Sequence, residues 1–174
     1  PKHGSFANAR LMTDNEKQLI RDWVKAGSPE GDPNQLPEPL KHTDGWQLPK
    51  TPDLVINMRD RAFDVSAEGT VRYQYFEIDP GLTEDTWIQA AEAQPGNRSV
   101  VHHILVFVRP PNRGGRGMEG TTGQFLAAYV PGHRAPIYPD GSAKLIPAGS
   151  KLIFQMHYTP IGTPQKDLSR LGLV

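Results

Sequence analysis

The sequence predicts an all-β domain, a two-sheet antiparallel sandwich preceded by one N-terminal α-helix. Glycine and proline are both abundant, with 17 of each among 174 residues, and they separate short apolar runs along the chain. About seven of these runs have the length and alternation of strands, and a single segment has helical periodicity. A chain of this length can form one ordinary domain with a real core.

The predicted helix covers residues 14–26. Thr13 and Glu16 have the spacing of a capping box, in which each side chain bonds the other residue's backbone N–H. An apolar stripe follows at helical spacing, made of Leu19, Ile20, Trp23 and Val24. Gly27 suits the left-handed position at which helices end.

The chain is expected to divide into three parts. Residues 28–45 begin with a proline-rich stretch of little apolar mass, which is typical of an extended linker. Residues 1–27 then form the helical tail of a preceding module, and residues 46–174 form the sandwich. The chain starts at Pro1 instead of Met and stops within an apolar run, so we expect a piece of a longer protein, truncated at its C-terminus.

The predicted strands follow one another without a second helix. They cover residues 54–58, 71–76, 87–93, 100–108, 125–130, 144–146 and 152–158. Turns are predicted at 95–97, 139–141 and 147–149, which contain Pro, Gly, Asn or Asp. Asp140 and Asp167 flank turns and are expected to serve them.

Composition excludes several classes of function. Lys+Arg and Asp+Glu are both 19, so the formal charge is zero, and no basic stripe indicates a nucleic-acid partner. No run approaches the about 18 apolar residues of a membrane span. The chain has no cysteine, which excludes disulfides, iron–sulfur ligation and thiolate chemistry.

Three histidines in apolar strands carry the strongest chemical signal. His102 and His103 are adjacent in the apolar stretch 99–108, and His157 closes the run 151–158. Burying one imidazole without a partner costs about a few kcal/mol, whereas a shared metal ion makes the same group stabilising. Neighbouring side chains of a regular strand point to opposite faces, so both tandem histidines can reach one ion only if the strand bulges.

Other interpretations stay open at this level. One histidine of the pair can be an ordinary core residue while the other faces solvent. A three-histidine zinc site would indicate a hydrolase or hydratase, although no acidic residue neighbours either motif to act as a general base. Copper suits a site of imidazoles without thiolate, because the affinity of such a site for divalent ions is highest for copper.

Two segments, 98–107 (RSVVHHILVF) and 152–158 (LIFQMHY), resemble a known family. They look like the N-terminal domain of the copper type II, ascorbate-dependent monooxygenases, the relatives of peptidylglycine α-hydroxylating monooxygenase and dopamine β-monooxygenase. The resemblance implies a jelly-roll-like sandwich and one electron-transferring copper bound by His102, His103 and His157. It also implies that Tyr75 and Gln155 lie close to those ligands.

The resemblance further implies partners and a compartment. An ascorbate-like reductant would supply electrons, O2 would react at a second copper on a following domain, and the protein would be exported, to a bacterial periplasm or the extracellular space. The family's His-x-His ligands of that second copper are absent from this sequence. Residues 4–32 resemble the end of a c-type cytochrome module without its Cys-x-x-Cys-His, so no haem is expected in this chain.

These observations lead to three hypotheses. The leading one is a type 2 copper domain that stores and passes single electrons. The second is a metal-free sandwich that binds glycans or docks other domains of a larger exported protein. The third is an enzyme in which the three imidazoles act unaided. His133, in a Pro/Gly loop, is a candidate additional ligand, although a solvated loop residue is the simpler interpretation.

Overall fold

The computed structural model describes residues 9, 11–39, 45–111, 123–133, 135 and 137–174. By contact density the chain splits into two compact units, Pro1–His42 and Thr43–Val174.

The smaller unit contains helix α1 (Asp14–Lys25) and a single 3-10 turn, η1 (Pro33–Gln35). The predicted capping box is confirmed: the Thr13 hydroxyl accepts the N–H of Glu16 at 3.2 Å, and the Glu16 carboxylate accepts the N–H of Thr13 at 2.6 Å. The bond from the Thr13 N–H, and after it one from the Thr13 hydroxyl to the same carboxylate at 2.8 Å, hold the pKa of Glu16 below its usual value. Gly27 stops the helix with φ 86° and donates its N–H to the carbonyl of Val24.

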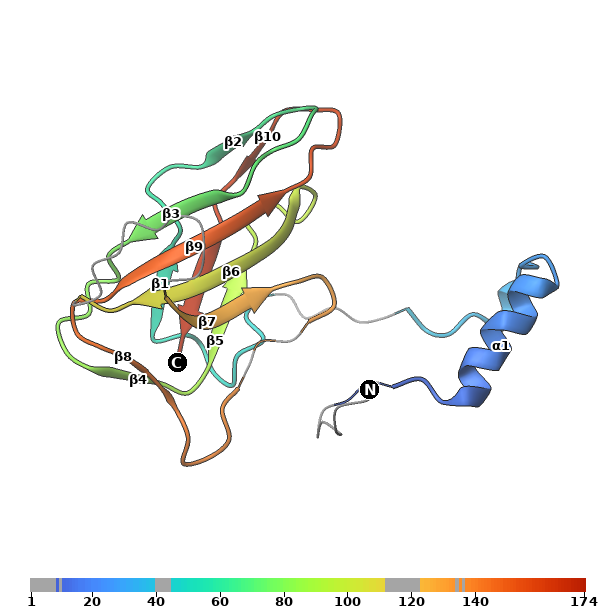
Figure 1. The fold of residues 1–174 in the computed structure, drawn as a ribbon, viewed down its shortest axis with the longest axis horizontal. Coiled ribbons are helices and arrows are strands. Elements are labelled where there is room, and N and C mark those ends of the chain that lie inside the picture. Colours follow the sequence, from blue (N-terminus) through green and yellow to red (C-terminus); the bar gives the residue numbers. More distant parts are fainter. Residues whose placement is uncertain (1–8, 10, 40–44, 112–122, 134, 136) are drawn as a thin grey trace. The chain divides into compact units, whose positions relative to one another are not determined.

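The larger unit is an antiparallel β-sandwich, as predicted (Figure 1). One layer is the sheet β3-β9-β6-β7 and the other is β1-β11-β5, with the two-stranded sheets β10-β2 and β4-β8 beside them. The strands are β1 (Leu54–Asn57), β2 (Phe63–Val65), β3 (Gln74–Ile78), β4 (Thr86–Ile88), β5 (Ala91–Gln94), β6 (Val101–Arg109), β7 (Gln124–Tyr129), β8 (Lys144–Ile146), β9 (Lys151–Tyr158), β10 (Gln165–Asp167) and β11 (Arg170–Leu173).

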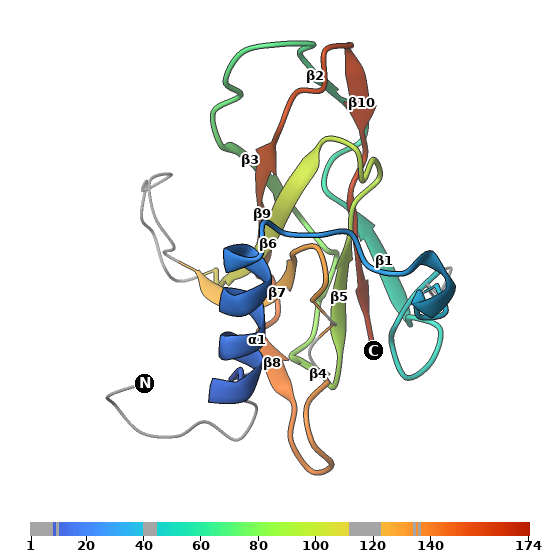
Figure 2. The same ribbon diagram turned by 90° about the vertical axis from the view of Figure 1, so that its right-hand side faces the viewer.

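The core fills the space between the two layers, which Figure 2 shows edge-on. Strand β9 alternates strictly, so that every second side chain is buried: Leu152, Phe154, Met156 and Tyr158. From the opposite layer, β1 and β11 contribute Ile56, Leu171 and Leu173. Burial of each such side chain contributes about 1.5–3 kcal/mol, which fixes which face of β9 turns outward.

Several strand predictions were wrong in their boundaries. The predicted strand 87–93 is two strands, because β4 pairs with β8 whereas β5 pairs with β11 in another sheet. Strands β2 and β10 were not predicted, β11 was recognised only as the apolar run at the C-terminus, and β3 begins only at Gln74. Asp167 ends β10 and is 1% exposed, and it bonds the distant turn at Asn97 instead of one beside it in the sequence.

No helix among the described residues is both long enough and apolar enough to cross a membrane.

Candidate metal centre

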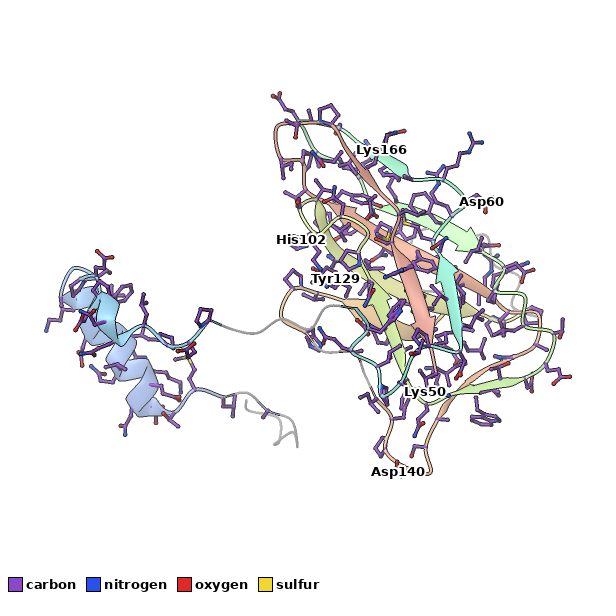
Figure 3. The ribbon with its side chains drawn as sticks, turned by 180° about the vertical axis from the view of Figure 1, so that it is seen from behind. Lys50, Asp60, His102, Tyr129, Asp140 and Lys166 are labelled. Carbon is purple, nitrogen blue, oxygen red and sulfur yellow. The ribbon has the colours of Figure 1, made fainter. Side chains whose placement is uncertain are left out.

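The three histidines come from two neighbouring strands, β6 and β9. His103 lies directly opposite His157 in the antiparallel register. Between Val101 and His103 the register shifts, so His102 is the extra residue of a bulge. The bulge that the tandem pair required is therefore present. His102 lies at the margin of the sandwich, where β6 begins (Figure 3).

The bulge brings all three imidazoles together. One ring nitrogen of each histidine lies within 4.8 Å of those of the other two. The ring of His157 has its centroid 4.7 Å from that of His102 and 4.9 Å from that of His103. Among the described residues this is the single cluster of three or more His, Asp or Glu side chains that could hold a metal ion.

The geometry of the ring nitrogens fits a metal ion. The Nδ1 atoms of His102 and His103 face each other at 3.2 Å. Two imidazole nitrogens bound at about 2.0–2.1 Å in a tetrahedral site lie about 3.3 Å apart, so the spacing is that of two ligands of one ion. The Nδ1 atom of His157 is buried and has no hydrogen-bond partner. Buried polar atoms without partners are rare, and a metal ion would satisfy this one.

The local electrostatics keep two of the three histidines in the neutral form, which is the form that can bind metals. Burial lowers the pKa of His103, and the nearby His157 and His102 lower it further because neighbouring positive charges repel. Burial and the charge of His102 likewise lower the pKa of His157. Both imidazoles are therefore neutral at neutral pH, the protonation state that a metal ion requires of them.

Tyr73 is the aromatic residue in contact with the cluster. Its ring centroid lies 4.9 Å from that of His157 and 5.7 Å from that of His103, and the side chain is 49% exposed. Sequence reasoning named Tyr75 as the aromatic residue near the site and missed Tyr73. The signal was present, because Tyr73 belongs to the same alternating run as Tyr75.

Tyr75 and Gln155 form the next row of the same sheet. They lie directly opposite each other on β3 and β9, and the Gln155 amide donates to the Tyr75 hydroxyl at 3.0 Å. Gln155 shares the outward face of β9 with His157, two residues away, or about 7 Å along the strand. The pair therefore borders the cluster.

The structure does not bring His133 into the cluster. It is an exposed residue of the connection between β7 and β8, and its N–H donates to the carbonyl of Val130 at 2.9 Å. Asp140 lies at the tip of the same connection, far from His102 (Figure 3). The cluster contains histidines alone, so among the described residues no carboxylate joins it as a ligand or base.

No protein-family model matches the chain, and no curated protein matches it either. The fold and the geometry of the three-histidine cluster therefore carry the functional argument.

Proposed function

We propose that this chain binds one copper ion through His102, His103 and His157 and passes single electrons. The observation that carries the proposal is the convergence of three ring nitrogens within 4.8 Å, with a 3.2 Å separation between the Nδ1 atoms of His102 and His103. The Nδ1 atom of His157 is buried without a hydrogen-bond partner, which supports this atom as the third ligand. All three histidines would thus coordinate through Nδ1.

The donor set favours copper over other metals. Affinity of a nitrogen site for divalent first-row ions peaks at copper, and neutral imidazoles also accept the cuprous ion. When bound, copper supplies one-electron redox chemistry. A zinc hydrolase would need a general base, and the described part of the chain places no carboxylate in the cluster.

The chain's own residues would serve electron transfer by staying fixed. His103 and His157 project from paired central strands, so their positions are set by the sheet and not by a loop. A rigid ligand set changes little between oxidation states, which keeps the reorganisation energy low. His102 is exposed and gives the site an edge open to solvent, where a small reductant can approach.

The resemblance of segments 98–107 and 152–158 to the ascorbate-dependent copper monooxygenases extends the proposal. The domain would take electrons from an ascorbate-like reductant and pass them to a second copper on a following domain, where O2 reacts with substrate. This sequence contains no His-x-His, so oxygen activation is assigned outside this chain. The same resemblance supports an exported protein of the periplasm or extracellular space.

Electron paramagnetic resonance of the full chain loaded with one equivalent of Cu(II) tests this function. We expect a type 2 signal with nitrogen hyperfine structure that disappears when ascorbate is added. His157→Ala removes a ligand and should lower copper affinity by more than about 100-fold, beyond the effect of losing an outer partner. His133→Ala is the matched control and should leave spectrum and affinity unchanged. Equal copper affinity in wild type and His157→Ala would refute the proposal, as would a marked preference for zinc.

A further inference from the structure

All three proposed ligands lie at strand ends. His102 and His103 follow directly after the first residue of β6, and His157 is the penultimate residue of β9. Because the strands are antiparallel, the start of β6 lies beside the end of β9, with Val101 opposite Tyr158. Strand ends open more readily than strand centres, so something must hold these two ends in register.

Tyr158 holds the end of β9 in place from the core side of the sheet. It follows His157 and points to the opposite face of the strand, where its side chain is 2% exposed. Its ring stacks on that of Phe63 at 5.1 Å, and its hydroxyl donates to Oδ2 of Asp167 at 2.9 Å. Burial raises the pKa of the Tyr158 phenol and the Asp167 carboxylate raises it further, so the phenol keeps the proton that it donates.

Asp167 receives three donors although it is 1% exposed. Besides the Tyr158 hydroxyl, the Ser169 hydroxyl donates to Oδ2 at 2.8 Å, and the N–H of Asn97 donates to Oδ1 at 2.8 Å. Hydrogen bonds to a carboxylate are about twice as strong as those between neutral groups. A buried carboxylate is retained only when its oxygens are satisfied in this way.

Asn97 connects this carboxylate to the start of β6. Its carbonyl accepts the N–H groups of Val100 and Val101 at 3.3 and 3.1 Å, which forms the turn that leads into the strand. The N–H of Thr159 donates to the carbonyl of Val100 at 2.8 Å and joins the same turn to the chain leaving β9. Asp167 therefore accepts a hydrogen bond from the turn before β6 through Oδ1 and one from the end of β9 through Oδ2.

We propose that Asp167 is a positioning residue of the metal centre, acting through Tyr158 on one side and Asn97 on the other. The carboxylate holds the two strand ends together from the core side, opposite the imidazoles. The bulge at His102 and the pairing of His103 with His157 depend on this register. The inference rests on the proposed metal-binding function but concerns residues that touch no ligand.

Two variants of the full chain test the inference. Tyr158→Phe keeps the ring stacked on Phe63 and deletes only the hydroxyl that Asp167 accepts. Asp167→Asn replaces one carboxylate oxygen with an NH2 group that cannot accept from its donors. Val108→Ala is the matched control, because it removes core contacts at the far end of β6, where Val108 pairs with Leu152. Copper affinity and the Cu(II) spectrum are measured beside the melting temperature of the metal-free protein.

We expect Tyr158→Phe and Asp167→Asn to lower copper affinity about 10-fold or more and to broaden the Cu(II) spectrum. Val108→Ala should lower the melting temperature with less than about a twofold change in affinity. Unchanged affinity and spectrum in Tyr158→Phe, or an equal loss of affinity in Val108→Ala, would overturn the inference. If Asp167→Asn does not fold, Tyr158→Phe decides alone.

Hydrogen exchange in metal-free protein separates this inference from the proposed function. Tyr158→Phe should speed exchange of the N–H groups of Val101 and Thr159 about 10-fold or more relative to the Val108→Ala control. If wild type binds no copper but this acceleration is seen, the metal proposal fails, whereas the role of Asp167 in holding the two strand ends together stands. If wild type binds copper but exchange in Tyr158→Phe is unchanged, this role of Asp167 is refuted and the metal proposal survives.

Discussion

Removing the His157 imidazole should change stability little in metal-free protein and markedly when copper is present. In metal-free protein the buried Nδ1 atom of His157 lacks a partner, a defect that costs about 1–3 kcal/mol. His157→Ala removes this defect and loses the packing of a half-buried ring against Tyr73 and His102, which is worth about 1–2 kcal/mol. The two effects nearly cancel, so the metal-free variant should be within about 1 kcal/mol of wild type.

Copper changes this balance in favour of wild type. With free copper at about 100 times its dissociation constant, binding to the folded state adds about 2.7 kcal/mol. For a unit of this size that corresponds to a rise in melting temperature of roughly 10 °C. The variant, lacking the third ligand, should gain almost nothing.

Thermal unfolding of both proteins, once in chelator and once in copper, measures the effect. His133→Ala serves as the control and should follow wild type in both conditions. If copper stabilised His157→Ala as much as wild type, His157 would not be a ligand. If the metal-free variant were destabilised by more than about 3 kcal/mol, the orphaned nitrogen would not be the defect that we infer.

Three further predictions concern the histidines, Tyr73 and the opposite layer of the sandwich. Because the pKa values of His103 and His157 are lowered in the folded state, the unfolded chain binds more protons below about pH 6.5. Melts of metal-free protein should therefore show stability falling as pH is lowered from 7 to 5. The slope of stability against pH should be smaller in His157→Ala, and an equal slope would contradict the assignment. Tyr73→Ala should lower copper affinity about 10-fold in a metal titration, whereas Tyr73→Phe should stay within about twofold because the ring makes the contact. A Cβ at Gly172 would lie 2.8 Å from the Trp46 ring, so Gly172→Ala should cost about 1–3 kcal/mol in urea unfolding, and this loss should shrink in a Trp46→Ala background; an undiminished loss would point to the backbone.

Features fixed by neighbouring residues could be predicted from the sequence. The helix was correct because Thr13 and Glu16 satisfy each other's backbone within one turn. The two faces of β9 follow from its strict alternation, but the expected burial of the imidazoles was wrong, because His102 is exposed and His103 and His157 are only partly buried. The bulge at His102 was predicted on the condition that the tandem imidazoles converge, and the structure contains it.

Features fixed by distant partners could not be predicted. Strand β11 exists because both its edges find partners, in β1 and β5, and four residues give no pattern by themselves. Nothing in the run 87–93 indicates that its two ends join different sheets. Asp167 was expected to serve a neighbouring turn, because its donor, the N–H of Asn97, lies 70 residues away and cannot be recognised from the adjacent sequence. Tyr73 shares its alternating run with Tyr75, and which of the two contacts the histidines depends on the pairing of β3 with the distant strand β9.

The placement of the cluster on β6 and β9 has a consequence for biosynthesis. His157 is translated 157 − 103 = 54 residues after His103. At about 5–20 residues per second the ribosome needs about 3–11 seconds to reach it. During that interval a nascent chain has only the adjacent pair of the three clustered histidines and lacks β9, the strand that pairs with His103. The proposed copper ion can therefore be bound by all three ligands only after β9 has been synthesised.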